Sequence, residues 1–150
     1  MSRSILFSVI TPVLNGQCFV PQFVHCLKTQ RYTSWEALIV DDGSSDRIID
    51  LLQSLTSNDP RFVLLRNPRI KQINGPYQAR NHALSLVRGD YICFLDIDDF
   101  WHPERLAYLL GLLRDPLLSL FLLIHRTIEL TLQEAWHSGV FLLGLYLRSS

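Results

Sequence analysis

The sequence has few cysteines and no excess of charge of either sign. Its 150 residues carry 14 Lys and Arg against 14 Asp and Glu, so the formal net charge is zero. Because nucleic-acid binding usually needs a basic surface, we predict no nucleic-acid partner. Cys18, Cys26 and Cys93 form no CxxC pair and no zinc spacing. We therefore expect free thiols in a reducing cytoplasm rather than a disulfide framework.

Long hydrophobic runs are also absent. The most apolar runs cover residues 117–124 and 140–147. Each has about eight residues, whereas a membrane-spanning helix needs about 20. The apolar stretch that ends at Pro12 is short too and gives no convincing signal peptide. We expect a cytoplasmic protein, peripheral at the inner face of the membrane if the two runs touch a membrane or a partner chain.

Apolar runs of two kinds alternate along the first three quarters of the chain. With 48% hydrophobic residues, the chain has enough apolar side chains to form a core. Short runs predict strands at 5–10, 35–40, 62–65 and 91–95. Helical spacing predicts helices at 19–27, 48–55, 79–87 and 103–113. This order predicts an α/β fold with a mostly parallel sheet and helices on both faces.

Local signals predict where three of these helices begin or end. Ser44 or Ser45 is placed to cap the second helix at its N-terminus. Gly89 is placed to close the third helix. Pro103 suits the first turn of the fourth helix.

The composition changes near residue 114. Residues 114–150 contain eleven leucines, no lysine, and no aspartate after Asp115. We expect a domain over 1–113 and a divergent leucine-rich tail over 114–150. One explanation of the tail is a truncated or frameshifted reading frame, and the other is a naturally short, divergent chain. Within the tail, 117–124 is a candidate fifth strand and 129–136 a candidate helix.

Three carboxylates follow the last predicted strand of the domain. Asp96, Asp98 and Asp99 come directly after the apolar run 91–95. Carboxylates crowded at the end of a buried strand repel one another and are costly to desolvate. We therefore expect a cation there, and a divalent metal that carries a phosphorylated ligand is the simplest candidate.

Two further polar clusters follow predicted strands in the same way. They are residues 11–15 and 41–46. Parallel strands bring their carboxyl ends to one edge of a sheet, where ligands of α/β proteins bind. Any one cluster alone could be an ordinary strand-to-helix turn, since Asp, Asn and Ser are common there. Three clusters in phase favour a binding site.

Four segments of the chain resemble the family 2 glycosyltransferases. The segments read SVITPVLN at 8–15, LIVDDGSSD at 38–46, ARNHAL at 79–84 and GDYICFLDIDD at 89–99. The family consists of inverting enzymes with the Rossmann-like GT-A fold, and the resemblance covers roughly 5–113. It implies the N-terminal, nucleotide-binding portion of such an enzyme, incomplete at its C-terminal end.

The resemblance implies a role for the residues after the first two strands. Thr11, Pro12 and Asn15 match the wall that cradles the base and ribose of the nucleotide. Asp41 resembles the acidic residue that hydrogen-bonds the base, usually uracil, and Asp42 is the neighbouring choice.

It also implies a role for the third helix and the acidic cluster. Arg80 and Asn81 match residues near the nucleotide, and an arginine there is placed to pair with phosphate. The acidic cluster matches the DxD motif, which holds Mn²⁺ or Mg²⁺ against the diphosphate of a sugar nucleotide. We assign Asp98 and Asp99 to the metal and Asp96 to the sugar nucleotide.

The implied activity is transfer of a sugar, with inversion and metal assistance, from a nucleotide-diphosphate sugar to an acceptor. The donor is expected to be a UDP-sugar, and the acceptor a saccharide or a lipid-linked glycan of cell-envelope polysaccharide biosynthesis. We assign no general base, because the contexts of Glu129 and Glu134 do not match the family's base motif. The alternative is a non-catalytic remnant that binds sugar nucleotides.

A remote alternative is a phosphotransferase with an aspartate nucleophile. That class usually has a threonine just after the acidic motif and a lysine further on. Here Phe100 and Trp101 follow, and no lysine comes after Lys71.

Trp101 suits either the sugar site or the core, and His102 is the one histidine close to the cluster.

Overall fold

Four of the apolar runs form adjacent parallel strands in the computed structural model, which describes residues 4–68, 76–114 and 145–147. The strands are β1 (Phe7–Val13), β2 (Trp35–Asp41), β3 (Phe62–Arg66), β4 (Tyr91–Phe94) and β5 (Leu145–Leu147). They lie in the order β3-β2-β1-β4-β5. The pairs among β1 to β4 are parallel, and β5 runs antiparallel to β4. The predicted mostly parallel sheet is therefore confirmed.

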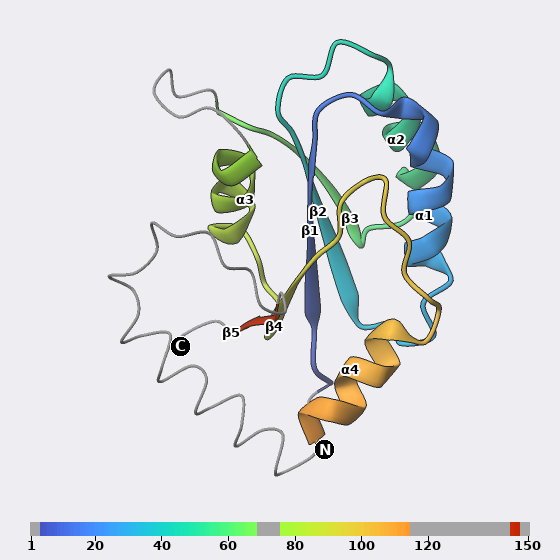
Figure 1. Cartoon of the computed structure of the whole chain (residues 1–150), viewed down its shortest axis with the longest axis vertical. Coiled ribbons are helices and arrows are strands. Elements are labelled where there is room, and N and C mark those ends of the chain that lie inside the picture. The colour runs from blue at the N-terminus through green and yellow to red at the C-terminus, as the bar shows by residue number, and fades with distance from the viewer. Residues whose placement is uncertain (1–3, 69–75, 115–144, 148–150) are drawn as a thin grey trace.

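Helices cover both faces of this sheet, as predicted. They are the short 3-10 helix η1 (Gln17–Phe19) and the α-helices α1 (Val20–Lys28), α2 (Ile48–Thr56), α3 (Pro76–Leu84) and α4 (Arg105–Arg114). Figure 1 shows α1 and α2 on one side of the sheet and α3 on the other. Because helices shield both faces, every residue of the interior strand β2 is buried.

The core consists of two clusters, one on each face. Val9 and Ile39 belong to the cluster that packs against α1, α2 and α4. Ile10 and Leu38 belong to the cluster that packs against α3. Successive residues of a strand thus alternate between the two clusters, as a pleated strand requires.

The strand order reverses at β1. The chain moves from β1 to β2 and β3 on one side and then crosses to β4 on the other side. Such a reversal makes a topological switch point, and open α/β sheets bind ligands beyond the carboxyl ends of the strands there. The switch point in this fold lies between β1 and β4.

Strand β1 is longer than predicted, since it continues through Pro12 to Val13 instead of ending at Ile10. Pairing with β4 ends at Ile10, whose carbonyl accepts a hydrogen bond from Leu95 N. Alternate residues of a strand point their backbone groups to the same side, so Pro12 points toward β4 as Ile10 does. Pairing with β4 has ended at this point, so no strand hydrogen bond is lost through the missing N–H of Pro12. That explains why a proline is tolerated within the strand.

The three predicted helix boundaries are wrong. Neither Ser44 nor Ser45 caps α2; its first N–H, on Ile48, donates to Asp46 Oδ1 at 3.2 Å. Helix α3 ends at Leu84, well before Gly89. Pro103 precedes α4, which begins at Arg105.

Gly89 has a different role from a helix cap. A Cβ added there would lie 2.5 Å from Ser8 Oγ, 2.7 Å from Ser8 N and 2.8 Å from Leu6 O. The glycine is therefore required by the close approach of the chain before β4 to the start of β1.

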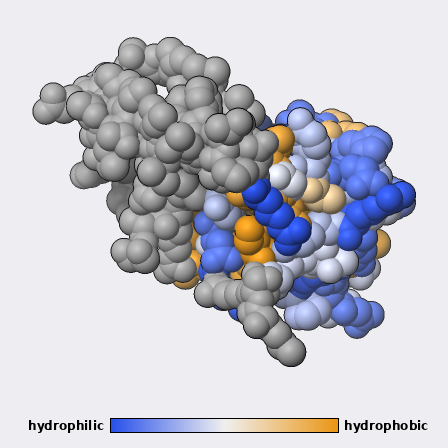
Figure 2. Space-filling model, turned by 90° about the horizontal axis from the view of Figure 1, so that it is seen from below, coloured by the Kyte–Doolittle hydropathy of each residue, from blue (hydrophilic) through white to orange (hydrophobic). Residues whose placement is uncertain are grey.

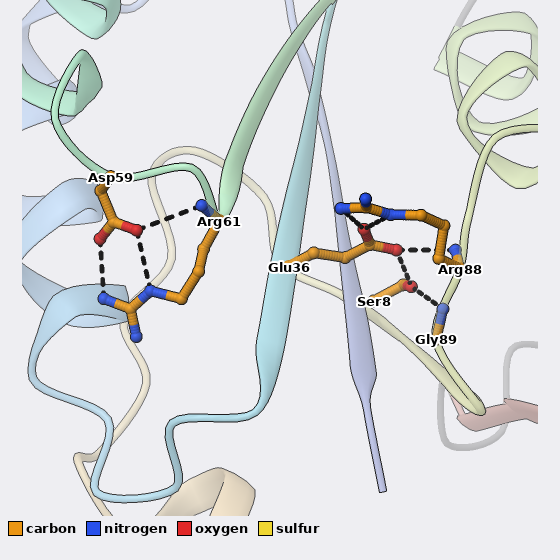
Figure 3. A network of polar contacts seen from close by, with 6 residues as sticks. All are labelled: Ser8, Glu36, Asp59, Arg61, Arg88 and Gly89. Atoms are coloured by element: carbon orange, nitrogen blue, oxygen red, sulfur yellow. Dashed lines mark hydrogen bonds and ion pairs between the residues drawn. The ribbon is translucent and has the colours of Figure 1, made fainter.

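A buried carboxylate fastens this approach. Glu36 on β2 accepts hydrogen bonds at Oε1 from Ser8 Oγ (2.7 Å) and Arg88 N (2.7 Å), and at Oε2 from Arg88 Nε (2.8 Å). Ser8 Oγ in turn accepts from Gly89 N (2.9 Å). Figure 3 shows this network, which joins β1, β2 and the segment that leads into β4.

The face where the strands begin differs from the edge where they end. Figure 2 shows the molecule from below, where β1 begins, with hydrophobic residues near the middle of the described surface. The polar loops after β1 and β2 lie at the opposite end in Figure 1. Within the described residues, no helix is long and apolar enough to cross a membrane.

The predicted strand 117–124 and helix 129–136 lie outside the described residues. Helix α4 ends at Arg114, close to the predicted end of the domain. The division into a domain at 1–113 and a tail at 114–150 stays a prediction.

Candidate functional site

The three polar clusters follow the carboxyl ends of β1, β2 and β4. Two backbone hydrogen bonds bring the loops after neighbouring strands together, from Asp42 N to Val13 O (2.8 Å) and from Asn67 N to Asp41 O (2.9 Å). The clusters thus share one edge of the sheet, because the strands that carry them are parallel and adjacent.

The loops after β1 and β2 are fastened to each other through Asn15. Its Oδ1 accepts hydrogen bonds from Ser45 N (2.8 Å), Ser45 Oγ (3.2 Å) and Asp46 N (3.3 Å). Its own N–H donates to Ser44 Oγ (2.8 Å), and Gln17 N donates to Asp46 Oδ2 (2.9 Å). Asn15 has a φ of 63°, a left-handed conformation that asparagine tolerates well. The Asn15 amide oxygen therefore holds the loop after β1 against the loop after β2.

The two carboxylates at the end of β2 also have partners within the protein. Asp41 is 6% exposed, and its Oδ1 accepts from Gly43 N (3.2 Å) and Ser44 N (2.8 Å). Asp42 Oδ1 accepts from Asn67 Nδ2 (2.7 Å). These bonds hold the loop in shape, so a ligand here would meet a preformed edge rather than a flexible one.

Three buried polar atoms of this site have no partner among the described residues. They are Thr11 Oγ1 on β1, Asn67 Oδ1 just after β3 and Arg80 Nε on α3. Buried polar atoms usually have a hydrogen-bond partner, so these atoms have bonding capacity left for a ligand or for water. Sequence reasoning missed Asn67, although its position just after the predicted strand 62–65 was a usable signal. Pro12, next to Thr11, is half-buried.

Helix α3 brings a cation to the acidic turn. Arg80 Nη2 lies 3.1 Å from Asp96 Oδ1, and the guanidinium carbon is 5.5 Å from the centre of the Phe94 ring. Arg80 is thus placed beside Asp96, at the end of the strand next to the switch point. Asn81, the next residue of the helix, is exposed.

The acidic turn after β4 is open to solvent. Asp96, Asp98 and Asp99 are all exposed, because the chain turns outward at the end of β4, with Asp99 N donating to Asp96 O at 3.1 Å. Water therefore solvates their charges, and the protein itself supplies a cation, Arg80, to one of them.

Asp98 and Asp99 fit a hard divalent cation by their chemistry. Their carboxylates are exposed and accept no hydrogen bond from any described residue. Such oxygens are the ligands that Mg²⁺ and Mn²⁺ prefer, with water and phosphate oxygens completing the shell. Over residues 4–68, 76–114 and 145–147, no three His, Cys, Asp or Glu side chains gather into a complete metal site.

The segment after the turn is anchored in the core by Trp101. This side chain is 6% exposed and stacks under the Arg105 guanidinium at 5.0 Å. It belongs to the core cluster that packs against α1, α2 and α4, called here the α1 face cluster. The nearby His102 Nδ1 accepts from Glu104 N (3.3 Å), just before α4 begins. An open groove of about 350 Å³ lies along this segment, lined by Phe100, Trp101, His102, Glu104, Arg105 and Tyr108. Trp101 therefore has a core role and also forms one wall of a surface groove.

Curated relatives share this part of the chain. The putative teichuronic acid biosynthesis glycosyltransferase TuaG of Bacillus subtilis is 38% identical over 101 residues, which cover 67% of this chain and 39% of that protein. The UDP-Glc:alpha-D-GlcNAc-diphosphoundecaprenol beta-1,3-glucosyltransferase WfgD of Escherichia coli is 37% identical over 101 residues, with 67% and 38% covered. This chain thus spans about two fifths of the length of these relatives.

A solved structure and a family profile agree with these relatives. The crystal structure of Staphylococcus aureus TarS 1-349 in complex with UDP matches 73% of this chain and 32% of that one, at 26% identity and a TM-score of 0.64. The fold is therefore the GT-A fold. The profile described as Glycosyl transferase family 2 matches residues 8–147. This match leaves the phosphotransferase alternative without support, and the chain belongs to glycosyl transferase family 2.

Proposed function

We propose that this chain binds a UDP-sugar at the carboxyl edge of its sheet and is the donor-binding part of an inverting, metal-assisted glycosyltransferase. Relatives whose names specify a UDP-glucose donor and teichuronic acid biosynthesis support a role in cell-envelope polysaccharide synthesis. The complex of TarS with UDP supports a uridine nucleotide as the ligand.

One arrangement carries the proposal: a cation and two free carboxylates lie together beside the switch point. Arg80 lies against Asp96, and Asp98 and Asp99 are exposed without protein partners among the described residues. In this proposal Asp98 and Asp99 hold Mn²⁺ or Mg²⁺, and Arg80 exchanges Asp96 for a phosphate oxygen. The metal would supply stabilisation of the charge that develops on the leaving diphosphate.

The nucleoside would lie against the loops after β1 and β2. In this proposal Asp41 and Asp42 contact the nucleotide base. Thr11 Oγ1 and Asn67 Oδ1 offer unpaired polar atoms at the same edge of the sheet. Pro12 and Asn15 form the wall, and Asn81 lies one residue from the phosphate-pairing Arg80.

No general base is part of the proposal. Glu104 is the first carboxylate after the acidic turn, and its Oε1 pairs with Arg31 Nη1 at 2.8 Å. Glu129 and Glu134 lie outside the described residues. The second candidate function is therefore binding of the sugar nucleotide without transfer.

For localisation we propose the cytoplasm, with peripheral association at the inner face of the membrane. A lipid-linked acceptor is the reason for this proposal, because the name of the relative WfgD specifies a diphosphoundecaprenol-linked acceptor.

Calorimetric titration of UDP in the presence of Mn²⁺ tests the donor site. We expect Asp98→Asn and Asp99→Asn each to weaken UDP binding by about tenfold or more, equal to about 1.4 kcal/mol, because each removes a charged metal ligand. Asp50→Asn is the matched control, since Asp50 is an exposed aspartate on α2 whose nearest cation, Arg47, is 3.7 Å away. Unchanged affinity in both site variants would contradict the metal assignment.

Release of UDP from a UDP-sugar separates the two candidate functions. Acceptor-dependent release, measured with a diphosphoundecaprenol-linked saccharide, is expected from a transferase. UDP binding without such release supports the non-catalytic alternative.

A further inference from the structure

The chain that leaves the acidic turn is tied to helix α1 by a buried thiol. Cys26 Sγ accepts a hydrogen bond from Trp101 N at 3.0 Å and donates one to Trp101 O at 3.3 Å. Cys26 is fully buried, and Trp101 stands only two residues after Asp99. Both backbone polar groups of Trp101 thus have the same sulfur atom as a partner.

A buried amide just after the end of α1 holds the next residues. Gln30 Nε2 donates to His102 O (2.9 Å), and Gln30 Oε1 accepts from Leu106 N (3.2 Å). Gln30 is 3% exposed, and Arg31 N donates to Pro103 O (2.9 Å). Because the Gln30 amide is buried, its two bonds are costly to break, and the segment 101–106 has one favoured path.

The other end of the acidic turn is fastened to β1. Leu95 N donates to Ile10 O at 3.2 Å, and within the turn Ile97 packs against the α1 face cluster. Ile97 also lies close to the loop after β1, since a Cβ added to Gly16 would be 3.7 Å from Ile97 Cγ2. The carboxylates therefore project from a short arc that is held at both ends.

The state of the thiol agrees with its two hydrogen bonds. Burial raises the pKa of Cys26, while the hydrogen bond from Trp101 acts in the opposite direction. The group therefore stays protonated at neutral pH, and the protonated form is the one that can donate and accept at once.

We propose that Cys26 and Gln30 are positioning residues that fix the acidic turn in the geometry that binds the metal–diphosphate group. Neither side chain touches the ligand; both act through the backbone of residues 101–106. Their loss lets the segment shift to find new partners for its buried N–H and C=O groups, and Asp98 and Asp99 move with it. This inference rests on the proposed donor site.

Affinity for UDP with and without Mn²⁺ tests the inference. Partners that orient metal ligands typically change metal affinity by 10–100-fold, so we expect Cys26→Ala and Gln30→Ala to weaken UDP binding with Mn²⁺ by about tenfold. UDP affinity in EDTA should change less than about twofold, because the base-binding loops after β1 and β2 are untouched. Cys26→Ser keeps a donor and an acceptor and should restore most of the loss.

Val24→Ala is the matched control for destabilisation. Val24 is a buried residue of the same helix and cluster, without a polar contact to the segment after the turn. It should lower the melting temperature, yet leave both affinities as in the unmodified chain. The melting temperature of each variant is measured by circular dichroism, and all titrations are made below it.

The outcomes separate this inference from the donor site itself. If the unmodified chain gains no UDP affinity from Mn²⁺, the proposed function fails. If Mn²⁺ raises the UDP affinity of the unmodified chain and raises that of Cys26→Ala and Gln30→Ala by the same factor, the inference alone is overturned. Equal losses with Mn²⁺ and in EDTA would also overturn it, since they would indicate general damage to the fold.

Discussion

At the scale of single residues, the amide of Asn15 has a clear structural role. The resemblance to family 2 glycosyltransferases implied a place for Asn15 beside the nucleotide. The structure adds that its Oδ1 receives three hydrogen bonds from Ser45 and Asp46, about 30 residues later. No local sequence pattern reveals a contact between two loops. The location of Asn15 near the site was therefore predictable, whereas its hydrogen-bond partners Ser45 and Asp46 were not.

Substitutions of Asn15 separate the hydrogen bonds from the backbone strain. Asn15→Asp keeps the acceptor and should unfold in urea within about 0.5 kcal/mol of the unmodified chain. Asn15→Gly loses the acceptor and should cost about 1 kcal/mol. Asn15→Ala should cost about 2 kcal/mol, because a left-handed φ adds about 1 kcal/mol for alanine. Equal stability of all three variants would show that the clamp between the loops contributes nothing.

The same scale shows a limit of reasoning from charge. A cation was expected beside the acidic residues 96, 98 and 99, because desolvating carboxylates at the end of a buried strand would be costly. They are exposed instead, since the turn projects them outward. Burial thus ends at Leu95, and among the described residues the cation that pairs with one of the three is Arg80, from a separate helix.

At the scale of elements, the apolar runs predicted every strand from β1 to β4 and the four α-helices. Their ends were less predictable, because contacts between elements decide them. β1 extends through Pro12 since β4 has stopped pairing there. Gly89 is required by the start of β1 rather than by the end of α3, which no sequence rule for helix caps can detect.

Two glycine-to-alanine substitutions test that interpretation with opposite signs. Gly89→Ala should destabilise the fold by about 2 kcal/mol or more, because its Cβ would overlap backbone atoms of Leu6 and Ser8. Gly111→Ala should stabilise by about 0.5–1 kcal/mol, because Gly111 lies inside α4 with nothing within 4 Å of an added Cβ. Thermal or urea unfolding measures both. A neutral effect at Gly89 would mean that the segment moves away from β1 at little cost.

At the scale of the whole molecule, strand order could not be read from the chain. An alternation of strands and helices fits several parallel sheets, and the order β3-β2-β1-β4 is one of them. The resemblance to a family implied the fold, and the polar clusters then indicated the edge that carries the site. The position of the switch point between β1 and β4 explains why the loop after β1 and the acidic turn belong to one site.

Two carboxylates, Glu36 and Asp59, link the stability of the whole fold to pH. Burial raises the pKa of Glu36, but hydrogen bonds from Ser8 and Arg88 outweigh it and leave the pKa below its ordinary value. Asp59 accepts from Arg61 Nε (2.9 Å) and Nη2 (2.7 Å), and these bonds lower its pKa as well. Figure 3 shows both carboxylates: Glu36 joins β1, β2 and the segment before β4, whereas Asp59 and Arg61 are paired within the turn that leads into β3.

The sign of the pH dependence follows from these lowered pKa values. Between the unfolded and the folded pKa the unfolded chain binds more protons, so stability is full above the ordinary glutamate pKa of 4.5 and is lost as pH falls below it. Each carboxylate contributes a slope of at most about 1.4 kcal/mol per pH unit in its window. Urea unfolding from pH 7 to pH 3 should therefore show a shallower acid loss for Glu36→Gln and for Asp59→Asn. Glu36→Gln should also be less stable at pH 7, by about 1.5–3 kcal/mol, because Glu36 is buried. An acid slope unchanged in both variants would mean that other carboxylates govern the acid unfolding of the fold.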